Sequence, residues 1–327
     1  MRKNEKEKSL AEIGNVLSSA DSILIFPHIQ IDGDALGSSV ALCGAFRKRG
    51  KKADIIIEDK IPENIKFLDK GYCVWDTDIT KPDVCIAVDC SDISRIVKRR
   101  DIFNGCKRTV SIDHHATAVP FADLNYLDDG ASSTGEIILR LLKAMKWSIE
   151  SDIAEAIYTA IVTDTGRFMY SNTSGKTHRI VAELLDTGMD HNKVSVEVYQ
   201  RNRLERIRLI NSIMSTLEIA SHGRCSLAIM TEQMLMDTGA YVEETEGVVE
   251  ELRSIDGVEI SAFLKQEKDN VKVTLRSKTE ADVSKIAMQF NGGGHKRAAG
   301  CTISGDINEV KLLIMQSIQK ELNDMGN

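Results

Sequence analysis

The chain has 327 residues, of which 42% are hydrophobic and 28% charged, and this length fits two domains better than one. Its formal net charge of −7 excludes a general binder of polyanions, so any nucleic acid has to be bound locally. The seven cysteines are odd in number and contain no C-x-x-C pair, which favours reduced thiols over a disulfide scaffold or a zinc ribbon.

The N-terminal stretch MRKNEKEKS is charged and lacks the apolar core of a signal peptide. No later segment reaches about 18 consecutive apolar residues, the length that a membrane-spanning helix needs. We therefore expect a cytoplasmic protein that makes no contact with a membrane.

Short apolar runs alternate with helical patterns over residues 1–190. Four runs are nearly continuous in apolar character, as expected of buried parallel strands: residues 22–26, 53–58, 83–88 and 108–112. Apolar spacing predicts helices over 35–50, over 134–147 and through Ile153, Ile157 and Ile161. The alternation predicts an α/β domain with a doubly wound, mostly parallel sheet.

The polar sequence from 191 to 220 has helical character and predicts a helical linker. After it the pattern restarts, with strands expected at 225–230, 259–266 and 270–278, helices at 248–255 and 282–290, a short strand at 301–304 and a C-terminal helix. Residues 221–327 are therefore predicted to form a second, smaller α+β domain.

Acidic and histidine residues follow the predicted strands and one helix of the first domain. They are His28, Asp32 and Asp34, then Asp89, then Asp113, His114 and His115, and finally Asp164. Because the carboxyl ends of parallel strands share one edge, these side chains are expected to meet. Carboxylates gathered in this way repel one another unless cations are present. The set suits two divalent ions that share one carboxylate, an arrangement used in phosphoester hydrolysis.

Each of these residues also has an ordinary explanation. Asp32 or Asp34 could cap the following helix, and His114 and His115 could lie in a surface turn. An EF-hand loop is excluded, because Leu36 stands where its third acidic residue belongs. Neighbouring side chains on a strand point to opposite faces, so one strand end can hardly bury both rings. The coincidence across four elements favours the metal site.

The motifs HIQIDGDALGS, VDCSD, DHH and TDTGRF resemble, in order and spacing, those of the DHH phosphoesterase superfamily. The second domain carries NGGGHKRAAG at 291–300, which resembles the signature of the DHH-associated C-terminal domain. Taken alone, this glycine run indicates either a turn whose N–H groups approach an anion or a tight connection between helix and strand. It is not a Walker loop, because arginine follows Lys296.

The resemblance implies that six side chains bind two ions: His28 and Asp32 on one, Asp34, His114 and Asp164 on the other, and Asp89 on both. His115 is then free to contact the scissile phosphate or to act as a general acid, with Asp113 supporting the site. The oxygen-rich donor set favours Mn²⁺, with Mg²⁺ or Co²⁺ as alternatives.

The resemblance also implies a substrate site in a cleft between the domains. Its residues are Arg167, Arg276, Gly293, Gly294, His295 and Arg297. The size resembles that of compact family members that degrade short RNA, and the acidic balance favours a short strand over a long one. We therefore expect hydrolysis of di- to pentanucleotides such as pApA and pGpG to 5′-mononucleotides, removal of the 3′-phosphate of pAp, and a homodimeric assembly.

Three alternatives share parts of this pattern: a cyclic-dinucleotide phosphodiesterase or pyrophosphatase, a RecJ-like single-strand exonuclease, and an inactive nucleotide-binding regulatory module. Family II pyrophosphatases lack the GGGH sequence, and the membrane-bound phosphodiesterases carry transmembrane segments. RecJ-like enzymes have further nucleic-acid-binding domains. An inactive module is disfavoured, because every implied ligand position holds a competent residue.

Overall fold

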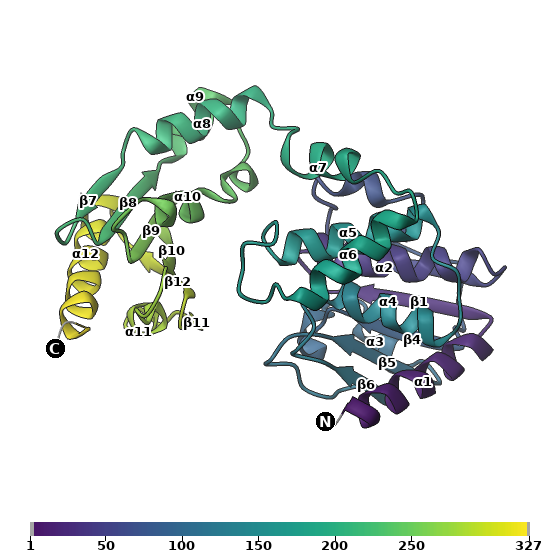
Figure 1. The fold of residues 1–327 in the computed structure, drawn as a ribbon. Helices are drawn as coiled ribbons and strands as arrows, with labels where there is room; N and C mark the ends of the chain where they lie inside the picture. The colour runs from purple at the N-terminus through teal and green to yellow at the C-terminus, as the bar shows by residue number, and fades with distance from the viewer. Residues whose placement is uncertain (1–2, 326–327) are drawn as a thin grey trace. The chain divides into compact units, whose positions relative to one another are not determined.

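The computed structural model describes residues 3–325, which form two units (Figure 1). The first unit ends at Arg201 and the second begins at Asn202. We call them unit 1 and unit 2. In the described part of the chain, none of the helices combines the length and the apolar character that crossing a membrane requires.

Unit 1 contains a wholly parallel six-stranded sheet in the order β3-β2-β1-β4-β5-β6. Its strands are β1 (Ser22–Pro27), β2 (Lys52–Ile56), β3 (Cys73–Val74), β4 (Val84–Val88), β5 (Thr109–Asp113) and β6 (Leu124–Leu127). This confirms the predicted parallel sheet. The sequence does not predict β3 and β6, because these short strands at the sheet edges are only partly buried and lack a continuous apolar run.

Helices cover both faces of the parallel sheet. They are α1 (Lys3–Ser19), α2 (Gly33–Arg47), α3 (Arg100–Asn104), α4 (Thr134–Ala144), α5 (Ser151–Asp164), α6 (Gly175–Asp186) and α7 (His191–Tyr199). Alternate side chains of β1 enter different cores, as the strand period requires. Ile23 and Ile25 pack with the larger helical layer, whereas Leu24 and Phe26 pack with Phe103 of α3 on the other face.

Helices α2 and α5 pack very closely (Figure 1). A Cβ atom at Gly37 would lie 2.4 Å from the carbonyl oxygen of Ala156, so only glycine permits this approach. Gly33, the first residue of α2, lies against Thr163 near the end of α5. The start of one helix is therefore held beside the end of the other.

The predicted linker over 191–220 is not a single helix. Its first part, α7, belongs to unit 1 and buries Val194, whereas α8 (Leu204–Met214) belongs to unit 2 and buries Leu209. The few residues between the two helices are exposed. The helix is interrupted because its two halves bury apolar side chains in different cores.

Unit 2 contains a mixed six-stranded sheet in the order β11-β12-β10-β9-β8-β7, in which only β8 and β9 pair in parallel. Its strands are β7 (Glu218–Ala220), β8 (Cys225–Met230), β9 (Ile260–Glu267), β10 (Asn270–Ser277), β11 (Gly293–His295) and β12 (Ala298–Ser304). Helices α11 (Val283–Met288) and α12 (Ile307–Asp324) cover one face. Helices α8, α9 (Glu232–Thr238) and α10 (Val248–Ser254) pack on the other, as an α+β unit requires.

Candidate metal centre

The strand order of unit 1 reverses between β1 and β4, since the chain builds outward from β1 to β3 and then returns to the other side of β1. Ligand sites of open α/β sheets lie outside the carboxyl ends of the strands at such a point. His28 directly follows β1 and Asp89 directly follows β4, so both lie at the reversal. Asp113 ends β5, and His114 and His115 follow it.

One group of candidate ligands consists of His28, Asp32 and Asp89. Nε2 of His28 lies 3.6 Å from Oδ2 of Asp32 and 3.5 Å from Oδ2 of Asp89. Asp32 is also the N-cap of α2, because its Oδ1 accepts hydrogen bonds from the N–H groups of Asp34 and Ala35. Helix capping therefore uses one oxygen of Asp32 and leaves the other facing the imidazole.

The other ring nitrogen of His28 is held by its surroundings. Nδ1 lies 2.6 Å from the carbonyl oxygen of Ile29 and 3.0 Å from Nη2 of Arg95, a residue that sequence reasoning missed. A proton on Nδ1, donated to that carbonyl, leaves the Nε2 lone pair for a cation. Burial opposes the charged ring, yet Asp32 and Asp89 outweigh it and raise the pKa of His28 to about 10.

A second group consists of Asp34, His114 and Asp164. Nε2 of His114 lies 3.6 Å from Oδ2 of Asp34, 3.6 Å from Oδ2 of Asp164 and 3.8 Å from Oδ1 of Asp89. This nitrogen is buried and has no hydrogen-bond partner among the described residues. Buried polar atoms are almost always satisfied, so a nitrogen left unpaired beside three carboxylates fits a metal ligand.

The electrostatics of this group also fit a cation. Burial raises the pKa of Asp34 well above its usual range, and the charges of Asp89 and Asp164 raise it further. Burial likewise raises the pKa of Asp164 to about 6, despite the opposing effect of His114. Two such carboxylates are costly as neighbouring anions, and a divalent ion would remove that cost.

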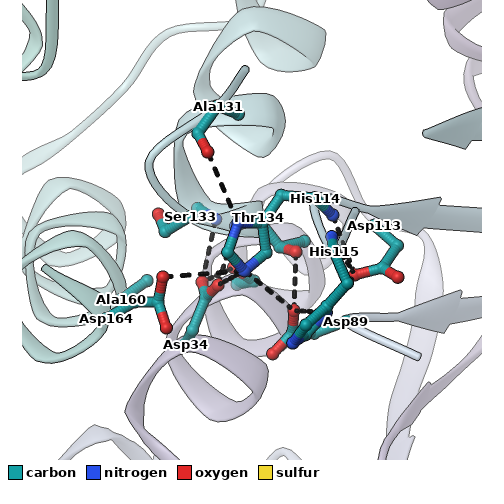
Figure 2. A network of polar contacts seen from close by, with 12 residues as sticks. Asp34, Asp89, Asp113, His114, His115, Ala131, Ser133, Thr134, Ala160 and Asp164 are labelled. Carbon is teal, nitrogen blue, oxygen red and sulfur yellow. Dashed lines mark hydrogen bonds and ion pairs between the residues drawn. The ribbon is translucent and has the colours of Figure 1, made fainter. Parts of the chain in front are cut away.

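Asp89 belongs to the first group and also to a third, with His114 and His115 (Figure 2). Its Oδ2 faces His28, whereas its Oδ1 faces His114. Its backbone is left-handed, with φ +61°, which costs a residue other than glycine about 1 kcal/mol or more. The strained backbone directs the carboxylate to a position from which each oxygen can serve a different ion.

His115 differs from His114 in its contacts and its exposure. Its Nδ1 lies 2.8 Å from Oδ1 of Asp113, and the side chain is 44% exposed. The hydrogen bond to Asp113 outweighs burial and raises the pKa of His115 to about 9, with a smaller contribution from the charge of Asp89. The Asp113 carboxylate therefore favours the protonated imidazole, whose Nε2–H can act as a donor.

The sequence predicts a helix from residue 134, as α4 has it, but not the contacts that its first residues make with the candidate ligands. The N–H groups of Thr134 and Gly135 donate to the two oxygens of Asp34, at 2.7 and 3.0 Å, and the Thr134 hydroxyl donates to Oδ1 of Asp89 at 2.8 Å (Figure 2). The spacing of Ser133 and Glu136 indicates a helix start. The spacing of these two residues does not predict which carboxylates the first residues of the helix contact.

The expected substrate residues lie in different surroundings. In unit 1 the Arg167 guanidinium lies 4.7 Å from the centre of the Tyr199 ring, three residues beyond Asp164. In unit 2 the Arg276 charge is already paired, because its Nε donates to Oε1 of Glu250 at 3.0 Å.

The glycine run forms strand β11 rather than a turn. It pairs antiparallel with β12, and Lys296 and Arg297 connect the two strands. Gly294 has φ +142°, and a Cβ there would lie 2.4 Å from the carbonyl oxygen of Ala298. Glycine is therefore required for the close pairing, and the hairpin leaves His295 and Arg297 exposed at its tip.

The fold and the two ligand groups define a two-unit α/β protein with a candidate dinuclear cation centre. The family model described as the N-terminal domain of the DHH family matches residues 22–161, and the DHHA1 domain matches residues 228–323. The chain therefore carries a DHH domain followed by a DHHA1 domain.

Relatives and a solved structure match nearly the whole chain. Proteins of Thermus thermophilus and Bacillus subtilis, both named bifunctional oligoribonuclease and PAP phosphatase NrnA, are each 29% identical to it. The matches cover 98% of this chain and 96% of the first relative, and 95% of this chain and 98% of the second. The crystal structure of an exopolyphosphatase-related protein from Bacteroides fragilis superposes with a TM-score of 0.91 at 28% identity, covering 98% of both chains.

Proposed function

We propose that this chain is a metal-dependent phosphoesterase that hydrolyses short oligoribonucleotides to 5′-mononucleotides and removes the 3′-phosphate of pAp. The observation that carries the proposal is the position of Asp89, whose two oxygens face two groups of candidate ligands. The substrate class is supported by relatives named for both activities, which match the chain over nearly its full length.

We assign each ligand group to one divalent ion: His28, Asp32 and Asp89 to the first, and Asp34, His114 and Asp164 to the second. We add Asp89 to the second ion as well, because its Oδ1 faces His114. Carboxylate oxygens with a few imidazoles suit Mn²⁺, and Mg²⁺ or Co²⁺ are the alternatives. Two ions at these positions would supply an activated water and stabilise the negative charge that develops on the phosphoryl oxygens.

The residues of the chain supply the proton transfer. Asp113 favours the protonated form of His115 and raises its pKa. Asp113 accepts the hydrogen bond from Nδ1 and so orients the ring. The remaining Nε2–H is the donor that we assign to the leaving ester oxygen, as general acid catalysis requires.

We further propose that exposed residues of unit 2 contact the part of the nucleotide that does not react. His295 and Arg297 at the tip of the β11–β12 hairpin are the main contacts, supported by Gly293 and Gly294 in the strand. Arg167 and Arg276 complete the proposed set of phosphate contacts. Arg276 has to share its charge with Glu250, so we expect its contribution to be the smaller one.

A substrate panel in the presence of Mn²⁺ tests the proposal. The panel contains pApA, pAp, cyclic di-AMP, pyrophosphate and 5′-labelled RNA of two to about seven nucleotides. We expect AMP from pApA, AMP and phosphate from pAp, and slower cleavage as the RNA lengthens. An Asp89→Asn preparation, purified in parallel, controls for contaminating nucleases. Protein that binds Mn²⁺ but hydrolyses neither pApA nor pAp would overturn the substrate class.

The same panel separates the alternatives. Preferential hydrolysis of cyclic di-AMP or of pyrophosphate would identify a different enzyme, and no hydrolysis of any substrate would indicate an inactive binding module. Arg297→Ala is expected to weaken nucleotide substrates more than a small generic phosphodiester.

A homodimer and a cytoplasmic location are also part of the proposal. Multi-angle light scattering of the purified protein measures the molar mass, and a monomer would contradict the first statement. Cell fractionation tests the second.

A further inference from the structure

Thr134, the first residue of α4, contacts two candidate ligands at once (Figure 2). Its N–H donates to Oδ2 of Asp34 at 2.7 Å, and its hydroxyl donates to Oδ1 of Asp89 at 2.8 Å. The side chain is fully buried. Asp34 and Asp89 belong to segments that are far apart in the sequence. Thr134 therefore forms hydrogen bonds to both carboxylates and holds them near each other.

The residues before Thr134 contact two more candidate ligands. The carbonyl oxygen of Ala131 lies 3.4 Å from Nδ1 of His114 (Figure 2). The side-chain amide of Asn172 donates to the carbonyl oxygen of Ser132 at 2.9 Å and to Oδ2 of Asp164 at 3.2 Å. Together, the residues that lead into α4 contact four of the six candidate ligands, either directly or through Asn172.

The contacts of Thr134 restrict the orientation of the Asp34 and Asp89 carboxylates. The N-terminus of α4 carries partial positive charge, which offsets part of the charge repulsion on Asp34. The hydroxyl occupies one lone pair of Oδ1 of Asp89 and restricts rotation of that carboxylate. Groups that hold metal ligands in this way determine how well the ligands bind the ion.

We propose that Thr134 is a positioning residue that holds Asp89 between the two cation positions. The inference rests on the proposed function, because it takes Asp34 and Asp89 as metal ligands. It adds that the position of the Asp89 carboxylate, which follows β4, depends on one hydroxyl group at the start of α4.

Three variants test this role. Thr134→Val keeps the shape and the backbone N–H but removes the hydroxyl, whereas Thr134→Ser restores a hydroxyl. The matched control is Thr159→Val, because Thr159 is equally buried in unit 1 and its hydroxyl donates to a helix carbonyl, that of Glu155, at 2.8 Å. Mn²⁺ affinity is measured by isothermal titration calorimetry, coupling between bound ions by electron paramagnetic resonance, and stability by thermal unfolding with a chelator present.

We expect Thr134→Val to weaken Mn²⁺ binding about 10- to 100-fold and to reduce the coupling between bound ions. Thr134→Ser is expected to recover most of the affinity, and Thr159→Val to bind Mn²⁺ as the wild type does, even if its melting temperature falls. Wild-type affinity in Thr134→Val would overturn the inference, as would equal losses in Thr134→Val and Thr159→Val.

Metal binding and hydrolysis are measured separately, so the two proposals fail separately. If the wild type binds Mn²⁺ but cleaves neither pApA nor pAp, the proposed substrates are wrong and the role of Thr134 is still decided by affinity. If the wild type hydrolyses pApA and Thr134→Val binds metal normally, only the inference about Thr134 is wrong. A wild type that binds no divalent ion would overturn both.

Discussion

Both units bury carboxylates in rich hydrogen-bond networks, yet the pKa values of these groups move in opposite directions. In unit 2, Glu259 accepts three backbone N–H bonds, from Thr279, Glu280 and Ala281, and one from the Thr279 hydroxyl. Burial works against its charge, but these bonds outweigh burial and lower the pKa of Glu259. This carboxylate is stable as an anion with the donors of its own chain.

In unit 1, Asp34 is hydrogen-bonded almost as well. It accepts two backbone N–H bonds from the start of α4 and one from the Ser38 hydroxyl. Its pKa is nevertheless raised, first by burial and then by the neighbouring Asp89 and Asp164. The comparison teaches that burial together with crowded carboxylates raises the pKa of Asp34, although hydrogen-bond donors alone suffice to stabilise the Glu259 anion.

The largest expected effect comes from removing the shared carboxylate. Asp89→Ala is expected to lower the rate of pApA hydrolysis about 10⁴-fold or more, equivalent to about 5.5 kcal/mol, because its two oxygens face His28 of one group and His114 of the other. Asp83→Ala is the matched control, since the Asp83 carboxylate caps backbone N–H groups at the start of the sheet. An active Asp89→Ala enzyme would refute the shared-ligand assignment.

The next effect separates the two adjacent histidines. His115→Ala is expected to slow turnover about 10²- to 10³-fold, the range of a lost general acid, and to keep its metal. His114→Ala is expected to lose metal, because Nε2 of His114 faces three carboxylates. Metal content by mass spectrometry and turnover are measured on the same preparations. Equal metal loss in both variants would contradict the assigned roles.

Metal binding itself is expected to stabilise the two units unequally. At about 100 times Kd, one bound ion stabilises the protein by about 2.7 kcal/mol. Hydrogen exchange should show this protection around the carboxyl ends of β1, β4 and β5, and not around the buried Glu259 in unit 2. A chelator should reverse it. Equal protection in both units would mean that the contrast between the two networks does not identify the cation site.

The smallest effect concerns Glu259. Glu259→Gln is expected to destabilise unit 2 by about 1 to 2 kcal/mol, because hydrogen bonds to a charged acceptor are weakened, and to leave Mn²⁺ affinity unchanged. The pKa of Glu259 lies below its usual 4.5 in the folded state, so its stabilisation is present above 4.5 and is lost as pH falls through the folded-state value. Urea unfolding at a series of pH values should show this loss in the wild type and little of it in the variant.

The sequence by itself determined the central strands of unit 1 and the edge of its sheet at which the candidate ligands gather. Continuous apolar runs specify buried parallel strands, and the spacing of Ile153, Ile157 and Ile161 specifies a helix. Because parallel strands end at one edge, polar residues such as His28 and Asp89, each directly after a strand, had to lie close together. These properties follow from the spacing of apolar residues along the chain and from the parallel order of the strands.

Only the tertiary structure decided which groups form hydrogen bonds or ion pairs with the candidate functional side chains. Thr134 and Asp34 are separated by 100 positions in the sequence and meet only because α4 and α2 pack on the same sheet. The sequence also did not predict that Arg276 pairs with Glu250, or that the predicted linker is divided between two cores. The local pattern of apolar residues predicts which positions are buried and whether they lie on a helix or a strand. The partner of a buried polar group depends instead on how elements far apart in the sequence pack together.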